Sequence, residues 1–157
     1  MKVRTDFVTN SSSSSFVVVF RNEAEMTACM HRIGQMYGPA FEEVVTRDVQ
    51  KYRRSRKAVR NLFRGYYKNE LYKKYYDSLD PRVRAVVPPS SIRIEVCNAE
   101  QMKVYIQSKV EQAMRNIPEN GYYALVKYGD ESGPFYEKLE HDIMPALPET
   151  VLRLSNH

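Results

Sequence analysis

The residues with the clearest chemical potential form one strongly basic segment. Between residues 47 and 84 the chain carries thirteen lysines or arginines and four acidic residues, a net charge of +9, whereas the rest of the chain sums to −4. Tyrosines alternate with these cations in the stretch YRRSRKAVRNLFRGYYKNELYKKYY. Lysine and arginine neutralise phosphates, and tyrosine stacks on bases. The residues that we expect at an interface with nucleic acid, or with a nucleic-acid-handling complex, are Lys51, Arg53, Arg54, Arg56, Lys57, Arg60, Arg64, Tyr66, Lys68, Tyr72, Lys73 and Lys74.

Two other interpretations of this segment stay open. The same cations suit an acidic protein surface, and they also suit a solvated helix face whose tyrosines pack on the rest of the protein. No helix-turn-helix, RNA-recognition or zinc-finger pattern accompanies the segment. If Arg53, Arg54 and Arg56 contact phosphates, replacing them should flatten the salt dependence of binding by roughly 2 units and leave the fold intact.

A second group of chemically capable residues lies near the C-terminus. Glu137, Glu140 and His141 fall within one helical turn, and with Asp130 or His157 they could hold the divalent metal of a hydrolase. The spacing does not match HExxH, and we favour a structural role such as a cap or a surface ion pair. We therefore expect no metal and no other cofactor.

Common enzyme signatures are absent from the sequence. It contains no GxGxxG, no phosphate-binding Walker loop and no GxSxG. The favoured function is therefore a non-enzymatic binding protein, with inhibition of a host defence or replication machine as one use of such binding. A metal-dependent hydrolase and a structural or oligomer-forming protein are the alternatives.

Composition predicts a folded protein of the cytoplasm. The chain has 157 residues, of which 43% are hydrophobic and 27% charged, enough apolar residues for one core. Its two cysteines, Cys29 and Cys97, form no metal or disulfide pattern, so we interpret both as reduced. The apolar run at residues 16–20 is too short to span a bilayer, and we expect no membrane association.

The first half of the chain predicts one strand followed by helices. FVVVF at residues 16–20 is apolar at every position, which is typical of a strand covered on both faces. Asn22 can cap a helix that ends at Gly38-Pro39, and a second helix begins at that proline. The apolar pattern is interrupted at residues 53–57 and resumes over 59–79. This predicts either a long helix or a helical hairpin, with a break near residues 53–57 or at Gly65.

The second half predicts alternating strands and helices. SIRIEV at residues 91–96 alternates as a half-buried strand does, Asn98 can cap a helix that runs to Ile117, and a third strand covers 122–128. A short acidic helix over 135–144 precedes a last strand at 151–155.

This element order predicts one α+β domain over residues 1–157. We expect a small four-stranded sheet with its helices mainly on one face, and a basic helical insertion over residues 39–87.

The serine run near the N-terminus is the least expected feature. Serine side chains hydrogen-bond to nearby backbone groups and so compete with the hydrogen bonds of helices and strands. We therefore expect residues 9–15 to be a flexible lead-in to the first strand. The stretch RTDFVTNSSSSSF at residues 4–16 resembles an N-terminal motif of many proteins from Firmicutes bacteria and from phages and prophages. The tail EHDIMP at residues 140–145, with Arg153 and His157, is similar to the ends of some Firmicutes proteins. The resemblance implies an origin in such a genome but no particular chemistry.

Overall fold

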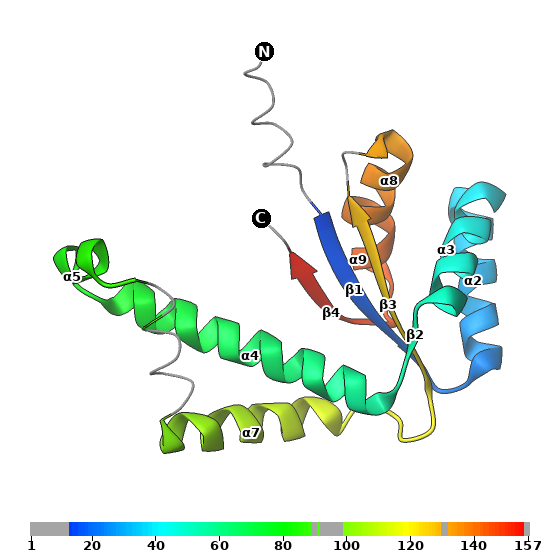
Figure 1. Cartoon of the computed structure of the whole chain (residues 1–157). Coiled ribbons are helices and arrows are strands. Elements are labelled where there is room, and N and C mark those ends of the chain that lie inside the picture. Colours follow the sequence, from blue (N-terminus) through cyan, green and yellow to red (C-terminus); the bar gives the residue numbers. More distant parts are fainter. Residues whose placement is uncertain (1–12, 89–90, 92–98, 130–131, 156–157) are drawn as a thin grey trace, which may run out of the picture. The chain divides into compact units, whose positions relative to one another are not determined.

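A computed structural model describes residues 13–88, 91, 99–129 and 132–155 of the chain (Figure 1). The chain divides into two compact units. The sheet unit comprises residues 1–56 and 118–157, and the helical unit comprises residues 57–117. In sequence, the helical unit is thus an insertion within the sheet unit.

The sheet unit is built on four antiparallel strands. β1 (Ser13–Phe20), β2 (Arg53–Arg54), β3 (Tyr122–Gly129) and β4 (Thr150–Ser155) stand in the order β2-β3-β1-β4. The predicted α+β class with a four-stranded sheet is therefore confirmed. The fourth strand is the short β2, which the sequence placed within the break between two helices. The strand predicted at 91–96 falls almost entirely outside the described residues.

β1 is the central apolar strand that the sequence predicts. All five residues from Phe16 to Phe20 are buried, and β1 pairs with β3 on one side and β4 on the other. The strand begins at Ser13, however, so the expectation of a flexible lead-in is wrong for Ser13, Ser14 and Ser15. Backbone pairing of Ser14 with both neighbouring strands overrides the low strand propensity of serine.

Two helices with local stop and start signals follow β1. α2 (Glu23–Tyr37) begins after Asn22, whose side chain accepts a hydrogen bond of 2.9 Å from the backbone N–H of Glu25. It ends at Gly38, whose φ of 113° suits glycine. α3 (Pro39–Lys51) begins at once, with proline in its first turn. These helices and the cap are as predicted.

The core of the sheet unit lies between one face of the sheet and the helices. Phe16, Val18 and Phe20 of β1 pack there with residues of β3, α2 and α3. Val45 and Val49 of α3 are fully buried in this core. α3 therefore belongs to the sheet unit, whereas the sequence assigned it to the basic insertion.

The C-terminal helix is continuous but changes its winding. α8 (Pro134–Lys138) passes into a π-helical turn, η2 (Leu139–Ile143), and then into α9 (Met144–Ala146). The N–H of Met144 bonds to the carbonyl of Leu139, which is the wider π spacing. Pro145 follows directly and has no N–H to donate to the carbonyl of His141. The apolar side of η2, Leu139 and Ile143, is fully buried in the core.

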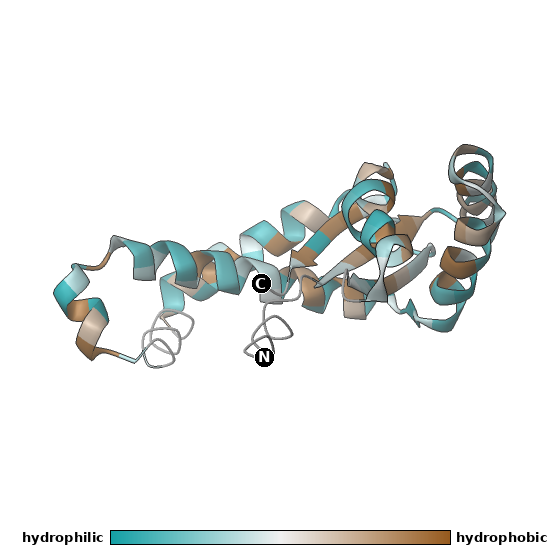
Figure 2. Ribbon diagram, turned by 90° about the horizontal axis from the view of Figure 1, so that it is seen from above, coloured by the Kyte–Doolittle hydropathy of each residue, from teal (hydrophilic) through white to brown (hydrophobic). Residues whose placement is uncertain are grey.

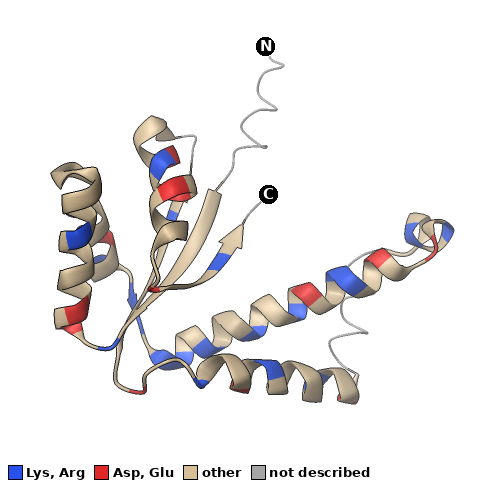
Figure 3. Ribbon diagram, turned by 180° about the vertical axis from the view of Figure 1, so that it is seen from behind, with Lys and Arg blue, Asp and Glu red and all other residues tan. Residues whose placement is uncertain are grey.

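The helical unit contains two long helices. α4 (Arg56–Ser78) runs without a break through Gly65, and α5 (Pro81–Val86) is capped by the side chain of Asp80. α7 (Glu100–Met114) follows with Ala99 at its cap position and no side-chain cap; the predicted cap, Asn98, lies outside the described residues. α4 and α7 lie side by side (Figures 1 and 3) and are joined by an ion pair between Arg60 and Glu111. None of the helices in the described ranges is both long and apolar enough to cross a bilayer.

Candidate nucleic-acid interface

The structure divides the predicted basic residues between the two units. Lys51, Arg53, Arg54 and Arg56 belong to the sheet unit, and the other eight residues lie on α4 in the helical unit. Figure 3 shows β2 and several parts of α4 in blue, with red acidic segments farther along the helix. Each set is therefore a candidate surface of its own unit.

Two arginines of the sheet unit hold local structure. The Arg53 guanidinium lies 4.0 Å from the ring centroid of Tyr122, and its backbone pairs with Ala124 of β3. Nε of Arg56 donates a hydrogen bond of 3.2 Å to the carbonyl of Pro118. Since these contacts connect β2 and the start of α4 to the β3 region, we now expect joint replacement of Arg53, Arg54 and Arg56 to destabilise the fold, which differs from the expectation drawn from the sequence.

The other two cations of the predicted set in the sheet unit are directed to solvent. Lys51 and Arg54 are exposed. Nζ of Lys51 lies 5.3 Å from the ring centroid of Tyr52. Nη1 of Arg54 donates a hydrogen bond of 3.2 Å to the carbonyl of Arg53. Both charges are thus held near β2 and stay accessible to a ligand.

One face of α4 carries cations and tyrosines together. An α-helix turns by about 100° per residue, so Lys57, Arg64 and Lys68 project roughly 120–160° away from the buried side chains Val59 and Phe63. The same geometry places Tyr72 and Tyr75 on this side. We call these five residues the outer face of α4. Most of α4 is coloured as hydrophilic in Figure 2.

The charges on the outer face are not balanced by acids. Among the described residues, no carboxylate lies within ion-pair distance of Lys57, Arg64 or Lys68, and Arg64 donates a hydrogen bond of 2.8 Å to the neutral side chain of Asn61. From Lys57 to Lys68 the helix rises by about 16 Å. The outer face therefore presents three cations over the length of several phosphates.

Two further predicted residues of α4, Lys73 and Lys74, are in mixed surroundings. Lys73 and Lys74 line a groove of about 440 Å³ together with two acids, Glu70 and Asp77, and with apolar surface; the further lining residues are Tyr67, Leu71 and Tyr105. Because cations and acids are equal in number there, this groove has no excess positive charge for phosphate.

Arg60 and Tyr66 are engaged within the helical unit. Arg60 pairs with Glu111 of α7, and Glu111 also accepts a hydrogen bond of 3.1 Å from Gln107. The hydroxyl of Tyr66 donates to Glu70 at 3.1 Å, and burial together with this contact raises the pKa of Tyr66. Arg60 thus serves the packing of the two helices, and the hydroxyl of Tyr66 is held by Glu70 on the same helix.

The C-terminal acidic cluster does not converge on one point. Glu140 is fully buried, whereas Glu137 and His141 are exposed. In the described part of the chain, no three His, Cys, Asp or Glu side chains are grouped so that they could hold a metal ion. Asp130 and His157, the further ligands considered for the hydrolase, lie outside the described residues.

Glu140 instead meets the serine run. The hydroxyl of Ser14, itself fully buried, donates a hydrogen bond of 3.0 Å to Oε2 of Glu140. Nε of Arg153 donates to the Ser14 hydroxyl at 3.2 Å, and Nε2 of His141 lies 3.3 Å from Oε1 of Glu140. A serine of β1, a carboxylate of η2 and an arginine of β4 therefore form one polar cluster, in which Ser14 and Glu140 are fully buried and Arg153 is exposed. The sequence pattern does not reveal this cluster, because Ser14 lies 126 residues before Glu140 and 139 residues before Arg153.

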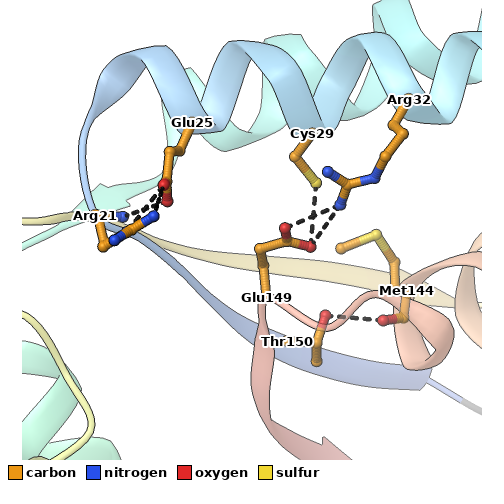
Figure 4. Close-up of polar contacts among 7 residues, drawn as sticks. All are labelled: Arg21, Glu25, Cys29, Arg32, Met144, Glu149 and Thr150. Carbon is orange, nitrogen blue, oxygen red and sulfur yellow. Dashed lines mark hydrogen bonds and ion pairs between the residues drawn. The ribbon is translucent and has the colours of Figure 1, made fainter.

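Cys29 is unsuited to nucleophilic chemistry. It lies on α2 and points with Arg32 toward Glu149, which precedes β4 (Figure 4). Its thiol donates to Oε1 of Glu149 at 3.5 Å, and Arg32 binds both oxygens of that carboxylate at 2.9 Å. Burial raises the pKa of the Cys29 thiol to about 12, and the negative charge of Glu149 acts in the same direction. The reactive thiolate is therefore negligible at neutral pH.

Comparisons with protein-family models, with curated proteins and with solved structures gave no match to this chain.

Proposed function

We propose that this protein binds single-stranded nucleic acid through the outer face of α4. Lys57, Arg64 and Lys68 bind successive phosphates, and Tyr72 and Tyr75 offer rings on which unpaired bases stack. The observation that carries the proposal is the excess of positive charge on this face, since the three cations have no carboxylate partner among the described residues.

The arrangement favours a strand bound without regard to its sequence. Phosphate contacts fix position but carry no sequence information, whereas discrimination between bases needs polar side chains at base edges. The outer face offers long flexible cations and two aromatic rings, of which Tyr75 is 43% exposed. Such a surface suits unpaired bases better than a duplex, in which both ring faces of every base are stacked.

The salt dependence of binding tests the proposal. A fluorescent oligonucleotide is titrated with the protein over a series of salt concentrations, and the logarithm of the affinity is plotted against that of the salt concentration. The triple variant K57A/R64A/K68A should bind more weakly at low salt, and its plot should be flatter by roughly 2 units, since each lost phosphate contact removes about 0.7.

A matched control separates local contacts from overall charge. The variant R21A/R82A/R115A loses the same formal charge from exposed positions outside the outer face. Its plot should keep the slope of the parent protein. Equal slopes in all three proteins would contradict the proposal. If the parent protein binds no oligonucleotide at low salt, the proposal fails, and an acidic protein surface becomes the better partner for the same cations.

A further inference from the structure

A second concave surface lies entirely within the sheet unit. It has a volume of about 420 Å³ and is lined by Ser15, Tyr52, Arg54, Leu125 and Lys127. We call it the sheet hollow. Small-molecule sites commonly measure about 300–1,000 Å³, so its size suits a ligand of the dimensions of a nucleotide.

Strand register explains why these residues meet. Ser15 of β1 is paired with Lys127 of β3, and Arg54 of β2 with Tyr123 of β3. Side chains of a strand alternate between its faces. Ser15, Leu125 and Lys127 therefore lie on the sheet face opposite the core residues Phe16 and Val126.

The end of α3 brings an aromatic ring to the same place. The backbone N–H of Leu125 donates a hydrogen bond of 3.1 Å to the carbonyl of Tyr52, the residue that ends α3. Tyr52 is 37% exposed. A phenol ring and the aliphatic side chain of Leu125 thus form the apolar part of the sheet hollow.

The polar part of the sheet hollow is positively charged. Arg54 and Lys127 are both exposed, and no acid is among the residues that line it. In the described ranges, neither cation has a carboxylate within ion-pair distance. Lys51 adds a further positive charge beside Tyr52. The hydroxyl of Ser15 provides a donor on the β1 side.

We propose that the sheet hollow binds a nucleoside monophosphate unit, either free or at the end of a strand. Arg54, Lys127 and the Ser15 hydroxyl bind its phosphate, and Tyr52 with Leu125 contacts its base. Two cations without an aromatic ring would suit any small anion, so the combination with Tyr52 selects a ligand that carries both a phosphate and a planar ring. The inference goes beyond the proposed function, because it uses none of the residues of the outer face of α4.

Three small probes and one oligonucleotide test the inference. Adenosine 5′-monophosphate, adenosine and inorganic phosphate are titrated into the protein while the methyl resonances of Leu125 are followed by NMR. The nucleotide should bind more tightly than either fragment. The variant R54A/K127A should bind it about tenfold more weakly or worse, because two charge-assisted contacts are lost. Tyr52→Leu should weaken binding of the nucleotide and leave binding of inorganic phosphate unchanged.

The oligonucleotide distinguishes the two sources of the ligand. A short oligoadenylate with a 5′-phosphate is titrated in the same way. If it shifts the Leu125 resonances and the free nucleotide does not, the ligand is the end of a strand. The variant K57A/K68A is the control, since it changes the outer face only and should bind the mononucleotide as the parent does. Circular dichroism and thermal melting establish that each variant is folded.

Three results would overturn the inference. The first is that neither the nucleotide nor the oligonucleotide shifts the Leu125 resonances. The second is that R54A/K127A binds as tightly as the parent. The third is that phosphate alone binds as tightly as the nucleotide, which would make the site a simple anion patch. Each result is independent of the salt slope at the outer face, so failure of this inference is distinct from failure of the proposed function.

Discussion

Replacing Ser14 with alanine tests whether the serine run is part of the folded core. Ser14 is fully buried, and its hydroxyl donates to Oε2 of Glu140 at 3.0 Å while it accepts from Nε of Arg153 at 3.2 Å. Alanine has nearly the same volume but removes both contacts. The backbone pairing of β1 with β3 and β4 is unchanged by this substitution, so the variant isolates the hydroxyl.

The expected cost follows from the surroundings of Glu140. A hydrogen bond to a charged group contributes about 1.5–3 kcal/mol, and more when the group left behind is buried. After the substitution, Arg153 and His141 still lie 3.9 Å and 3.3 Å from the oxygens of Glu140, so the carboxylate keeps two polar neighbours. We expect Ser14→Ala to lower the free energy of unfolding by about 2 kcal/mol. For a chain of this size, that is a fall in Tm of about 4–8 °C.

Ser15 supplies the control on the same strand. Its side chain lies on the opposite sheet face and is only half-buried, so Ser15→Ala should change the free energy of unfolding by less than about 0.5 kcal/mol. Urea unfolding of both variants, and of Glu140→Gln with and without Ser14→Ala, gives the coupling between Ser14 and Glu140. This coupling should reach about 1 kcal/mol. Equal stabilities for the Ser14 and Ser15 variants, or no coupling, would refute the assignment of Ser14 to the core.

Two further predictions concern stability. Burial raises the pKa of the Cys29 thiol to about 12, and burial together with Asp48 raises the pKa of Tyr128. In the unfolded chain these groups have pKa values of about 9 and 10. The stability that they contribute is therefore complete below those values and is lost as the pH rises above them. Urea unfolding over an alkaline pH series should show a decline of at most about 1.4 kcal/mol per pH unit for each group, and Cys29→Ala and Tyr128→Phe should each make the decline shallower; an unchanged decline in both variants would contradict the buried placements. A Cβ on Gly121 would lie 2.6 Å from the backbone carbonyl of Phe20, whereas one on Gly65 would meet nothing within 4 Å. Gly121→Ala should therefore lower Tm, while Gly65→Ala should raise stability by about 0.5–1 kcal/mol because it lies inside α4, and the reverse order in thermal melting would be incompatible with these two environments.

Features of the fold that depend on neighbouring residues could be predicted from the sequence. Asn22 caps α2 because its side chain reaches an N–H three residues away, and Gly38-Pro39 separates two helices because of the backbone preferences of these two residues alone. The run from Phe16 to Phe20 predicts a strand with both faces buried, since it contains no polar residue at all. These signals act over a few residues, so no knowledge of the rest of the fold is needed to recognise them.

Features that depend on distant partners could not be predicted. β2 contains only Arg53 and Arg54, which have no strand pattern, and it is a strand because β3 lies beside it. Ser14 extends β1 because β3, β4 and Glu140 meet there, and none of them is near it in sequence. Strand propensity is a property of such surroundings more than of the residue itself.

The basic segment was recognisable by composition, but its division into roles was not. Helix phase decides that Lys57 and Lys68 project away from the buried side of α4, and this phase holds from Lys57 to Lys68 because α4 runs unbroken through Gly65, which the sequence left open. Arg60 is paired through Glu111, a residue of another helix. Lys127 was missed because a single lysine at one end of an apolar strand resembles an ordinary solvated position.

The serines of β1 show how one short stretch can meet two different demands. Ser14 faces the core, where Glu140 requires a donor of small volume. Ser15 faces the other side, where the sheet hollow requires a side chain that leaves space and still offers a hydroxyl. A bulky apolar residue at position 14 would deprive Glu140 of the Ser14 hydroxyl, and one at position 15 would fill the sheet hollow. Because alternation along a strand sends adjacent residues to opposite faces, only consecutive small polar residues satisfy both sites. The abrupt change from serines to FVVVF thus falls where β1 passes from these two polar sites into the apolar centre of the sheet.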